Sequence, residues 1–183
     1  MRKRRVLLDV DGVLGDFLGH SFPVLEKLTG RKWAYADFQT WDIFDTVSRE
    51  YERAFFDEIN QPGWCQSIPV FSGSQDGVRR LMEISDLYVV TSPMNHVPTW
   101  MYEREQWLLK HFGIPHKRVV HTSAKYLCLG DVLIDDRPAN IEAWEKEHLG
   151  GRGFLWHQTY NRASTVGKRV LSWDQTIEAL QGR

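Results

Sequence analysis

Two aspartates near the start of the chain, Asp9 and Asp11, have the residue type and the spacing for chemistry at one site. An apolar run ends in Asp9, and Gly12 follows Asp11, so the backbone can turn sharply there. Residues two apart in an extended chain point to the same side, which places both carboxylates together at the end of a strand. Two like charges this close are tolerated beside a cation, and a divalent metal ion is the obvious candidate. The pair therefore predicts metal-assisted chemistry.

Further polar groups stand at or just beyond the ends of other predicted strands: Thr91 and Ser92, then Lys125, then Asp135 and Asp136. In a parallel sheet these ends share one edge, so we expect all of these groups to converge. Hydroxyl and backbone N–H groups bind phosphate oxygens, and a lysine ammonium offsets charge on a transferring group. Carboxylates and a backbone carbonyl suit Mg²⁺. Together the groups predict phosphoryl transfer.

Short apolar runs that alternate with helical patterns must position these groups. Strands are predicted at Val6–Val10, Asp86–Thr91, Arg118–His121, Asp131–Asp135 and Gly153–Trp156. Most of them lack polar alternation, which is typical of strands buried on both faces of a parallel sheet. Helices are predicted at Asp76–Ile84, Thr99–His111, Pro138–His148 and Trp173–Leu180. The alternation predicts an α/β fold with a Rossmann-like, doubly wound parallel sheet.

The long interval between the first two strands predicts an inserted cap. It is too long for one crossover helix, and it contains two helical patterns, Phe22–Leu28 and Ser48–Ile59. We expect a core of residues 1–16 and 71–183 and a small helical cap of residues 17–70. The cap would cover the carboxyl ends of the strands, where ligands bind in open α/β sheets.

The polar groups, taken in order, resemble the four motifs of the haloacid dehalogenase (HAD) superfamily of phosphohydrolases. The matching stretches are Asp9–Val13, Val89–Ser92, Lys125 and Leu133–Asp136. One motif alone could occur by chance, whereas four in the right order after predicted strands are specific. Within the superfamily, the stretches most similar to the 5′(3′)-deoxyribonucleotidases are Asp9–Phe17, Thr91–Pro93 and Leu133–Arg137, and Trp156–Asn161 is loosely similar. Those enzymes remove phosphate from deoxynucleoside monophosphates.

The resemblance implies a covalent mechanism. Asp9 would attack phosphorus and form an aspartyl-phosphate. Asp11 would protonate the leaving oxygen and then take a proton from the hydrolytic water, which calls for a partly desolvated site. Thr91, Ser92 and Lys125 would bind the phosphate.

The resemblance also implies Mg²⁺ as the cofactor. The side chain of Asp9 and the backbone carbonyl of Asp11 would bind the ion. Asp136 would be the third protein ligand, and Asp135 would hold a metal-bound water. The sequence does not separate these last two roles.

Four aromatic residues are candidates to contact a nucleobase: Phe17, Trp41, Phe44 and Trp64. A small cap could instead use such rings to fill its own core. Ligand contact is favoured for Phe17, which lies close to the catalytic strand, and the two interpretations stay open for the others. His157 and Asn161 are expected to approach the site.

Composition limits the partners. The net charge of −1 provides no broad basic field for polymeric nucleic acid, so a small-molecule nucleotide is the expected substrate. Cys65 and Cys128 form no zinc-type spacing and are expected to be reduced thiols. No signal-peptide core or run of 18 apolar residues occurs, so we expect a cytoplasmic protein without a membrane partner. The sequence leaves a homodimer open.

Two alternative functions remain at this stage. The first is a HAD phosphatase that acts on a sugar phosphate or on a polynucleotide end. The second is a non-catalytic protein that binds a phosphorylated ligand on the same fold. The cap distinguishes the substrates, because an aromatic pocket favours a nucleobase and a polar cap favours a sugar.

Overall fold

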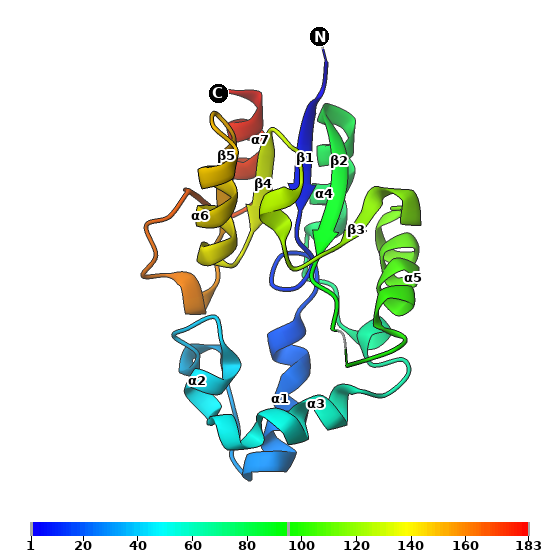
Figure 1. Ribbon diagram of the computed structural model, residues 1–183, viewed down its shortest axis with the longest axis vertical. Coiled ribbons are helices and arrows are strands. Elements are labelled where there is room, and N and C mark those ends of the chain that lie inside the picture. Colours follow the sequence, from blue (N-terminus) through cyan, green and yellow to red (C-terminus); the bar gives the residue numbers. More distant parts are fainter. Residues whose placement is uncertain (1, 95, 183) are drawn as a thin grey trace.

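The computed structural model describes residues 2–94 and 96–182, and its centre is a six-stranded sheet (Figure 1). The strands lie in the order β3-β2-β1-β4-β5-β6, and every neighbouring pair is parallel. Their bounds are β1 Arg4–Leu8, β2 Ser85–Thr91, β3 Val119–His121, β4 Val132–Asp135, β5 Arg152–Trp156 and β6 Lys168–Val170. This arrangement confirms the predicted Rossmann-like fold. The pattern of apolar runs misses β6, because two of its three residues are charged.

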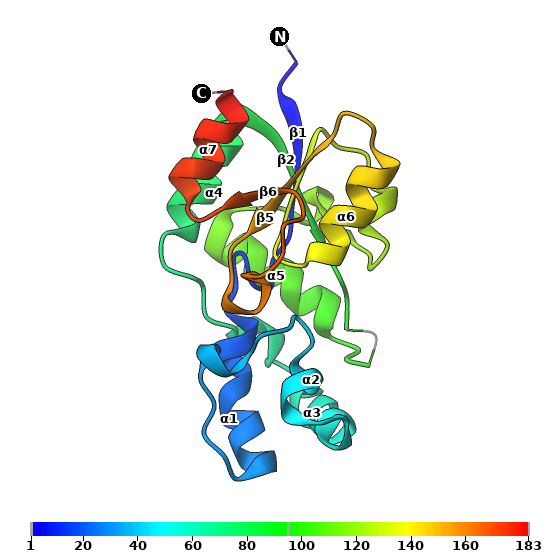
Figure 2. The same cartoon turned by 90° about the vertical axis from the view of Figure 1, so that its left-hand side faces the viewer.

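Helices cover both faces of the sheet, which explains why its strands are apolar on both sides (Figure 2). The core helices are α4 (Ser74–Ile84), α5 (Trp100–Phe112), α6 (Pro138–Glu147) and α7 (Trp173–Gln181). Helices α4, α5 and α7 pack on the face that contains Val6 and Leu8 of β1, whereas α6 packs on the face that contains Leu7. In residues 2–94 and 96–182, no helix is long and apolar enough to cross a membrane.

A helical insert follows β1 and lies beyond the carboxyl ends of the strands, as predicted (Figure 1). It contains α1 (Phe17–Thr29), α2 (Ile43–Val47), α3 (Glu52–Ile59) and the short 3₁₀ helices η1 (Tyr35–Asp37), η2 (Arg49–Tyr51) and η3 (Cys65–Ser67). Leu25, Phe38 and Phe55 belong to its own apolar cluster. Its two connections to the core run side by side, joined by a hydrogen bond from the Asp16 N–H to the Pro69 carbonyl at 2.9 Å.

The helices of the insert differ from the predicted ones at their ends. Helix α1 begins at Phe17, five residues before the predicted start, because the Asp16 side chain accepts a hydrogen bond from the Gly19 N–H at 2.9 Å. The predicted helix Ser48–Ile59 is present from Arg49, first as the 3₁₀ helix η2 and then as α3. Helix α2 before it was not predicted, and it ends before Ser48, whose φ of 115° lies outside the helical region.

Candidate active site

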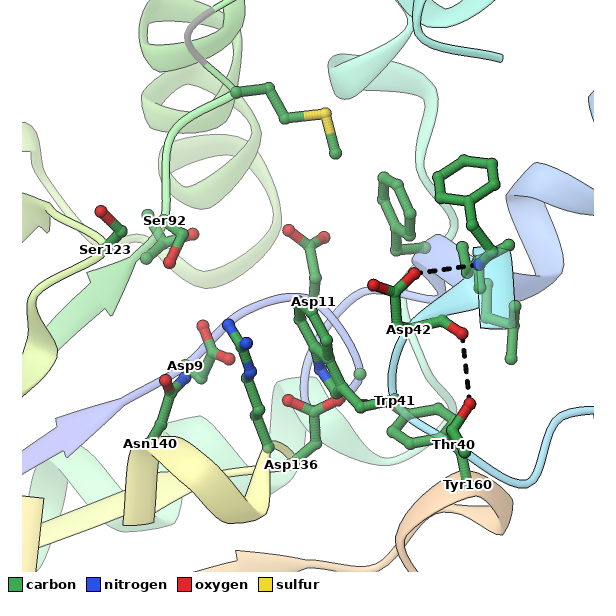
Figure 3. Close-up of a pocket in the computed structure, with 18 of the residues that line it drawn as sticks. Asp9, Asp11, Thr40, Trp41, Asp42, Ser92, Ser123, Asp136, Asn140 and Tyr160 are labelled. Carbon is green, nitrogen blue, oxygen red and sulfur yellow. Dashed lines mark hydrogen bonds between the residues drawn. The ribbon is translucent and has the colours of Figure 1, made fainter. Parts of the chain in front are cut away.

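The ends of three neighbouring strands bring the predicted site residues together. Strands β2, β1 and β4 are adjacent, and Asp9 is the first residue after β1. Six of the residues predicted for catalysis, phosphate binding or metal binding line one pocket: Asp9, Asp11, Thr91, Ser92, Lys125 and Asp136. Figure 3 shows Asp9 and Asp136 on the core side of this pocket and Trp41 and Asp42 on the cap side. The pocket has a volume of about 470 Å³, within the usual range for small-molecule sites.

Three buried carboxylates meet at the base of the pocket. Oxygen atoms of Asp9, Asp135 and Asp136 lie within 4.8 Å of one another. Burial and then the charge of Asp135 raise the pKa of Asp9 to about 7, and the same two causes raise the pKa of Asp136 well above its usual range. Because the charged forms are disfavoured without a cation, the three carboxylates form a site suited to a hard divalent metal ion.

Lys125 supplies one positive charge to this group. It lies at the start of the 3₁₀ helix η5 (Lys125–Leu127), and its Nζ lies 2.6 Å from Asp9 Oδ1 and 2.8 Å from Asp135 Oδ2. Burial opposes its charge, but Asp135 and Asp9 outweigh burial and raise the pKa of Lys125 above its usual value. One ammonium beside three carboxylates leaves a deficit of positive charge.

Asp135 and Asp136 have different surroundings. Asp135 is fully buried, and its carboxylate accepts hydrogen bonds from Lys125 Nζ, the Arg137 N–H and the Asn140 side chain at 2.8–3.1 Å. Asp136 lines the pocket, and its Oδ2 accepts a hydrogen bond from the Tyr160 hydroxyl. Asp135 is thus directed into the protein, whereas Asp136 is directed toward the pocket.

The carboxylate of Asp11 is paired with a different cation, Arg104. This carboxylate lies 2.7 and 2.8 Å from Nη2 of Arg104 on α5, and it does not join the group formed by Asp9, Asp135 and Asp136. Gly12 follows with a φ of 79°, and a Cβ at this position would overlap the Asp136 carboxylate and the Tyr160 hydroxyl. The turn after β1 therefore needs glycine both for its conformation and for space.

The hydroxyl of Thr91 is a candidate to bind a ligand oxygen. Thr91 is 1% exposed, and its Oγ1 has no hydrogen-bond partner in the described part of the chain. A buried hydroxyl without a partner is costly, and a phosphate oxygen would satisfy it. Ser92 lines the same side, and its Oγ makes only a long contact of 3.5 Å with the Thr122 carbonyl.

The four predicted base-contacting aromatics separate into two groups. Phe17, Trp41 and Phe44 line the pocket, and the Trp41 ring stacks on Arg137 with 3.9 Å between the ring centroid and Cζ. Trp64 is not among the lining residues. Its indole packs against Phe17 and other rings at the base of the insert, 5.4 Å from Phe17 between centroids, and so has a packing role there.

His157 and Asn161, which were expected to approach the site, differ in their positions. Asn161 is buried in the 3₁₀ helix η6 (Thr159–Asn161), and its amide donates to the Asp136 carbonyl at 2.7 Å. His157 does not line the pocket, and its Nδ1 lies 3.0 Å from Arg169 Nη1. Asn161 therefore supports the backbone at Asp136, whereas His157 is paired with Arg169 outside the pocket lining.

Comparison with protein families shows the family of this chain. Residues 3–181 match the family described as 5′ nucleotidase, deoxy (pyrimidine), cytosolic type C protein. The chain belongs to this family. The chain is 28% identical over 177 residues to the 5′(3′)-deoxyribonucleotidase of Bacillus subtilis, covering 94% of this chain and 96% of that one. Its family identifies it as a phosphomonoesterase, as the sequence predicts.

Solved structures confirm the fold of the nucleotidase. A haloacid dehalogenase-like hydrolase from Streptococcus pneumoniae superposes with a TM-score of 0.62 at 13% identity, covering 98% of this chain and 99% of that one. The magnesium-bound YfnB protein of Bacillus subtilis, a candidate HAD-hydrolase, gives 0.60 at 15% identity, covering 99% and 100%. At these identities the similarity shows the shared HAD-like fold.

Three residues at the site are not among the predicted site residues: Arg104, Asn140 and Tyr160. Asn140 could have been found, since it lies in the first turn of a predicted helix that begins just after Asp136. Tyr160 lies in Trp156–Asn161, whose loose similarity to the family could have indicated it, whereas Arg104 reaches Asp11 only through long-range folding and has no local signal.

Proposed function

We propose that this nucleotidase removes phosphate from deoxynucleoside monophosphates, with Mg²⁺ and through an aspartyl-phosphate intermediate. One observation carries the proposal. The buried group of Asp9, Asp135 and Asp136 lies at the base of a pocket, with aromatic rings above it and, beside it, a Thr91 hydroxyl that has no hydrogen-bond partner among the described residues. A cation site, an oxyanion donor and a surface for a planar ring are the three features that a nucleotide phosphatase needs.

The residues present fit a magnesium ion. Asp9 and Asp136 face the pocket and would hold it, together with the backbone carbonyl of Asp11. Asp135 is occupied by Lys125 and Asn140, which supports an orienting role for it. When bound, Mg²⁺ offsets negative charge on the carboxylates and on the phosphoryl group.

The side chains of the pocket support two chemical steps. A carboxylate oxygen of Asp9 attacks phosphorus, the bond from phosphorus to the ester oxygen breaks, and Asp11 gives a proton to that leaving oxygen. Water then attacks the phosphorus of the aspartyl-phosphate while Asp11 takes its proton. The bond to Asp9 breaks, which releases inorganic phosphate and restores both aspartates.

Groups around phosphorus hold the phosphate oxygens during both steps. Thr91 Oγ1, which has no hydrogen-bond partner among residues 2–94 and 96–182, can donate to a phosphate oxygen from the end of β2, and so can Ser92 Oγ, whose contact with the Thr122 carbonyl is long at 3.5 Å. Lys125 already bridges Asp9 and Asp135, so its charge lies beside the attacking oxygen. Fixed donors and charge placed in advance lower the barrier, since they need no rearrangement during the reaction.

The walls of the pocket favour a nucleotide over a sugar phosphate. Phe17, Phe44, Phe55 and Phe56 line the side contributed by the insert. Each base presents a planar face that stacks on such rings. Small-molecule nucleotides remain the proposed partners, and the cytoplasmic location and a homodimer stay predictions.

A screen of phosphate release tests this function. Purified enzyme with Mg²⁺ is assayed on deoxynucleoside and ribonucleoside monophosphates, sugar phosphates and a 5′-phosphorylated oligonucleotide. The proposal expects the highest kcat/KM on a deoxynucleoside monophosphate. Preference for a sugar phosphate or for the oligonucleotide end would overturn the substrate assignment while leaving the phosphatase chemistry in place.

A further inference from the structure

Arg104 is a charged side chain in the interior whose role is not explained by stability. It lies on α5 and is fully buried, and in residues 2–94 and 96–182 its one salt bridge is to Asp11. Its Nε and Nη1 are buried without hydrogen-bond partners in the same part of the chain. Replacing a buried ion pair by apolar residues is often neutral or stabilising, so an incompletely satisfied guanidinium contributes little to folding.

The guanidinium is nevertheless held firmly in place. Trp100 and Trp107 lie on the same face of α5, and Cζ of Arg104 is 5.2 and 5.4 Å from their ring centroids. Trp107 is itself fixed by a hydrogen bond from Nε1 to the Ile68 carbonyl at 2.8 Å. The cation is therefore positioned by two buried rings before any ligand arrives.

Helix α5 is also fixed against the base of the insert. The neighbouring residue Glu103 is buried, and its carboxylate accepts hydrogen bonds from the Gly63 and Gln66 N–H groups at 2.7 and 3.3 Å. Two adjacent residues of one helix thus hold the connection from insert to core and the side chain of Asp11. Movement of α5 would displace both.

Arg104 is the hydrogen-bond partner of the Asp11 carboxylate among the described residues. Its Nη2 contacts both oxygens, and no other hydrogen bond to this carboxylate is found among the described residues. Asp11 itself lies at the pocket and is 27% exposed, so without Arg104 its side chain could rotate into solvent. We propose that Arg104 is a positioning residue, which holds Asp11 where it can exchange protons with the leaving oxygen and with the hydrolytic water. The inference rests on the proposed function, in which Asp11 is the proton donor and acceptor.

A double-mutant cycle tests the inference. Arg104→Met should lower kcat for a deoxynucleoside monophosphate by roughly 10- to 100-fold and change KM by less than about threefold, because a misplaced acid slows the reaction without weakening binding. In the Asp11→Asn background the same substitution should have almost no further effect. Arg79→Met, which removes exposed ion pairs with Asp76 and Glu83 on α4, is the matched control and should leave kcat unchanged.

An aryl substrate separates the two proton transfers. p-Nitrophenolate leaves without a proton, so Arg104→Met should still release the first equivalent rapidly. The following turnover should be slow, because Asp11 must take a proton from water. If Arg104→Met loses both the rapid release of the first equivalent and the later turnover, the nucleophile is damaged, and this result would overturn the positioning role.

Two further results would contradict the inference. One is a kcat within threefold of the original enzyme, and the other is an equal loss with and without Asp11. If circular dichroism shows that Arg104→Met does not fold, Arg104→Lys replaces it in the same cycle, with an intermediate loss of kcat expected. If the enzyme hydrolyses p-nitrophenyl phosphate but no nucleotide, only the proposed substrate is refuted. The double-mutant cycle of Arg104 and Asp11 is then measured with the aryl ester.

Discussion

The core edge and the helical insert contribute to one pocket, but they are built in different ways. At the core edge, charged side chains are buried and paired, as with Lys125 between Asp9 and Asp135. In the insert, rings pack on rings, as with Phe44 and Phe55 at 5.5 Å between centroids, and charges such as Arg49 stay at the surface. In the proposed function the core would carry the chemistry, and the insert would provide the surface against which a substrate is selected.

The largest effect should come from the nucleophile at the core edge. Asp9→Asn should lower kcat by roughly 10⁴-fold or more on every substrate, because no aspartyl-phosphate can form. The measurement is phosphate release from a nucleotide and from p-nitrophenyl phosphate. A near-normal rate on either substrate would exclude the covalent mechanism.

Removal of the metal ion should change turnover and thermal stability through the carboxylates of the core edge alone. EDTA should abolish turnover, and Mg²⁺ should raise the melting temperature of the metal-free enzyme, because binding to the native state stabilises it. Asp136→Asn should remove most of this thermal shift, whereas Asp45→Asn, an exposed carboxylate of the insert, should keep it. Equal shifts in the two variants would place the ion elsewhere.

The buried carboxylates should also make the stability of the metal-free enzyme depend on pH. The folded pKa of Asp9 is raised from its usual value of 3.8 to about 7, so between these values the native state binds more protons than the unfolded state. The free energy of unfolding should therefore fall, on the order of a few kcal/mol, as pH rises from about 4 to 7. Urea unfolding at several pH values measures this decrease in the free energy of unfolding. Asp9→Asn should flatten the dependence, and an unchanged slope in that variant would contradict this cause.

The smallest effect should come from the insert. Phe17→Ala should raise KM for a deoxynucleoside monophosphate by about 10-fold, because loss of one base contact costs roughly 1–3 kcal/mol. Its effect on p-nitrophenyl phosphate should be smaller. Phe17 also packs against Phe55 and Trp64, so the melting temperature is measured in parallel. Equal losses on both substrates would mean that the ring only supports the fold.

These two regions also differ in how much of them could be predicted. The core strands follow from apolar runs, and Asp9, Thr91 and Asp136 follow from their places at strand ends, since parallel pairing brings such ends to one edge. The insert was less predictable. Its ring-rich sequence is consistent with core packing and with ligand contact, and only the structure shows that Phe17, Trp41 and Phe44 line the pocket whereas Trp64 does not. The division at residues 17–70 stays a prediction.

The sequence by itself determined the layered α/β core, the position of the insert and the order of the polar groups, because these depend on local periodicity and on strand ends. The tertiary structure decided which cation faces each carboxylate. Lys125 meets Asp9 and Asp135, whereas Arg104, 93 positions away along the chain, meets Asp11. The physical reason is that ion pairs act over a few ångströms in space, a distance that spacing along the chain does not specify.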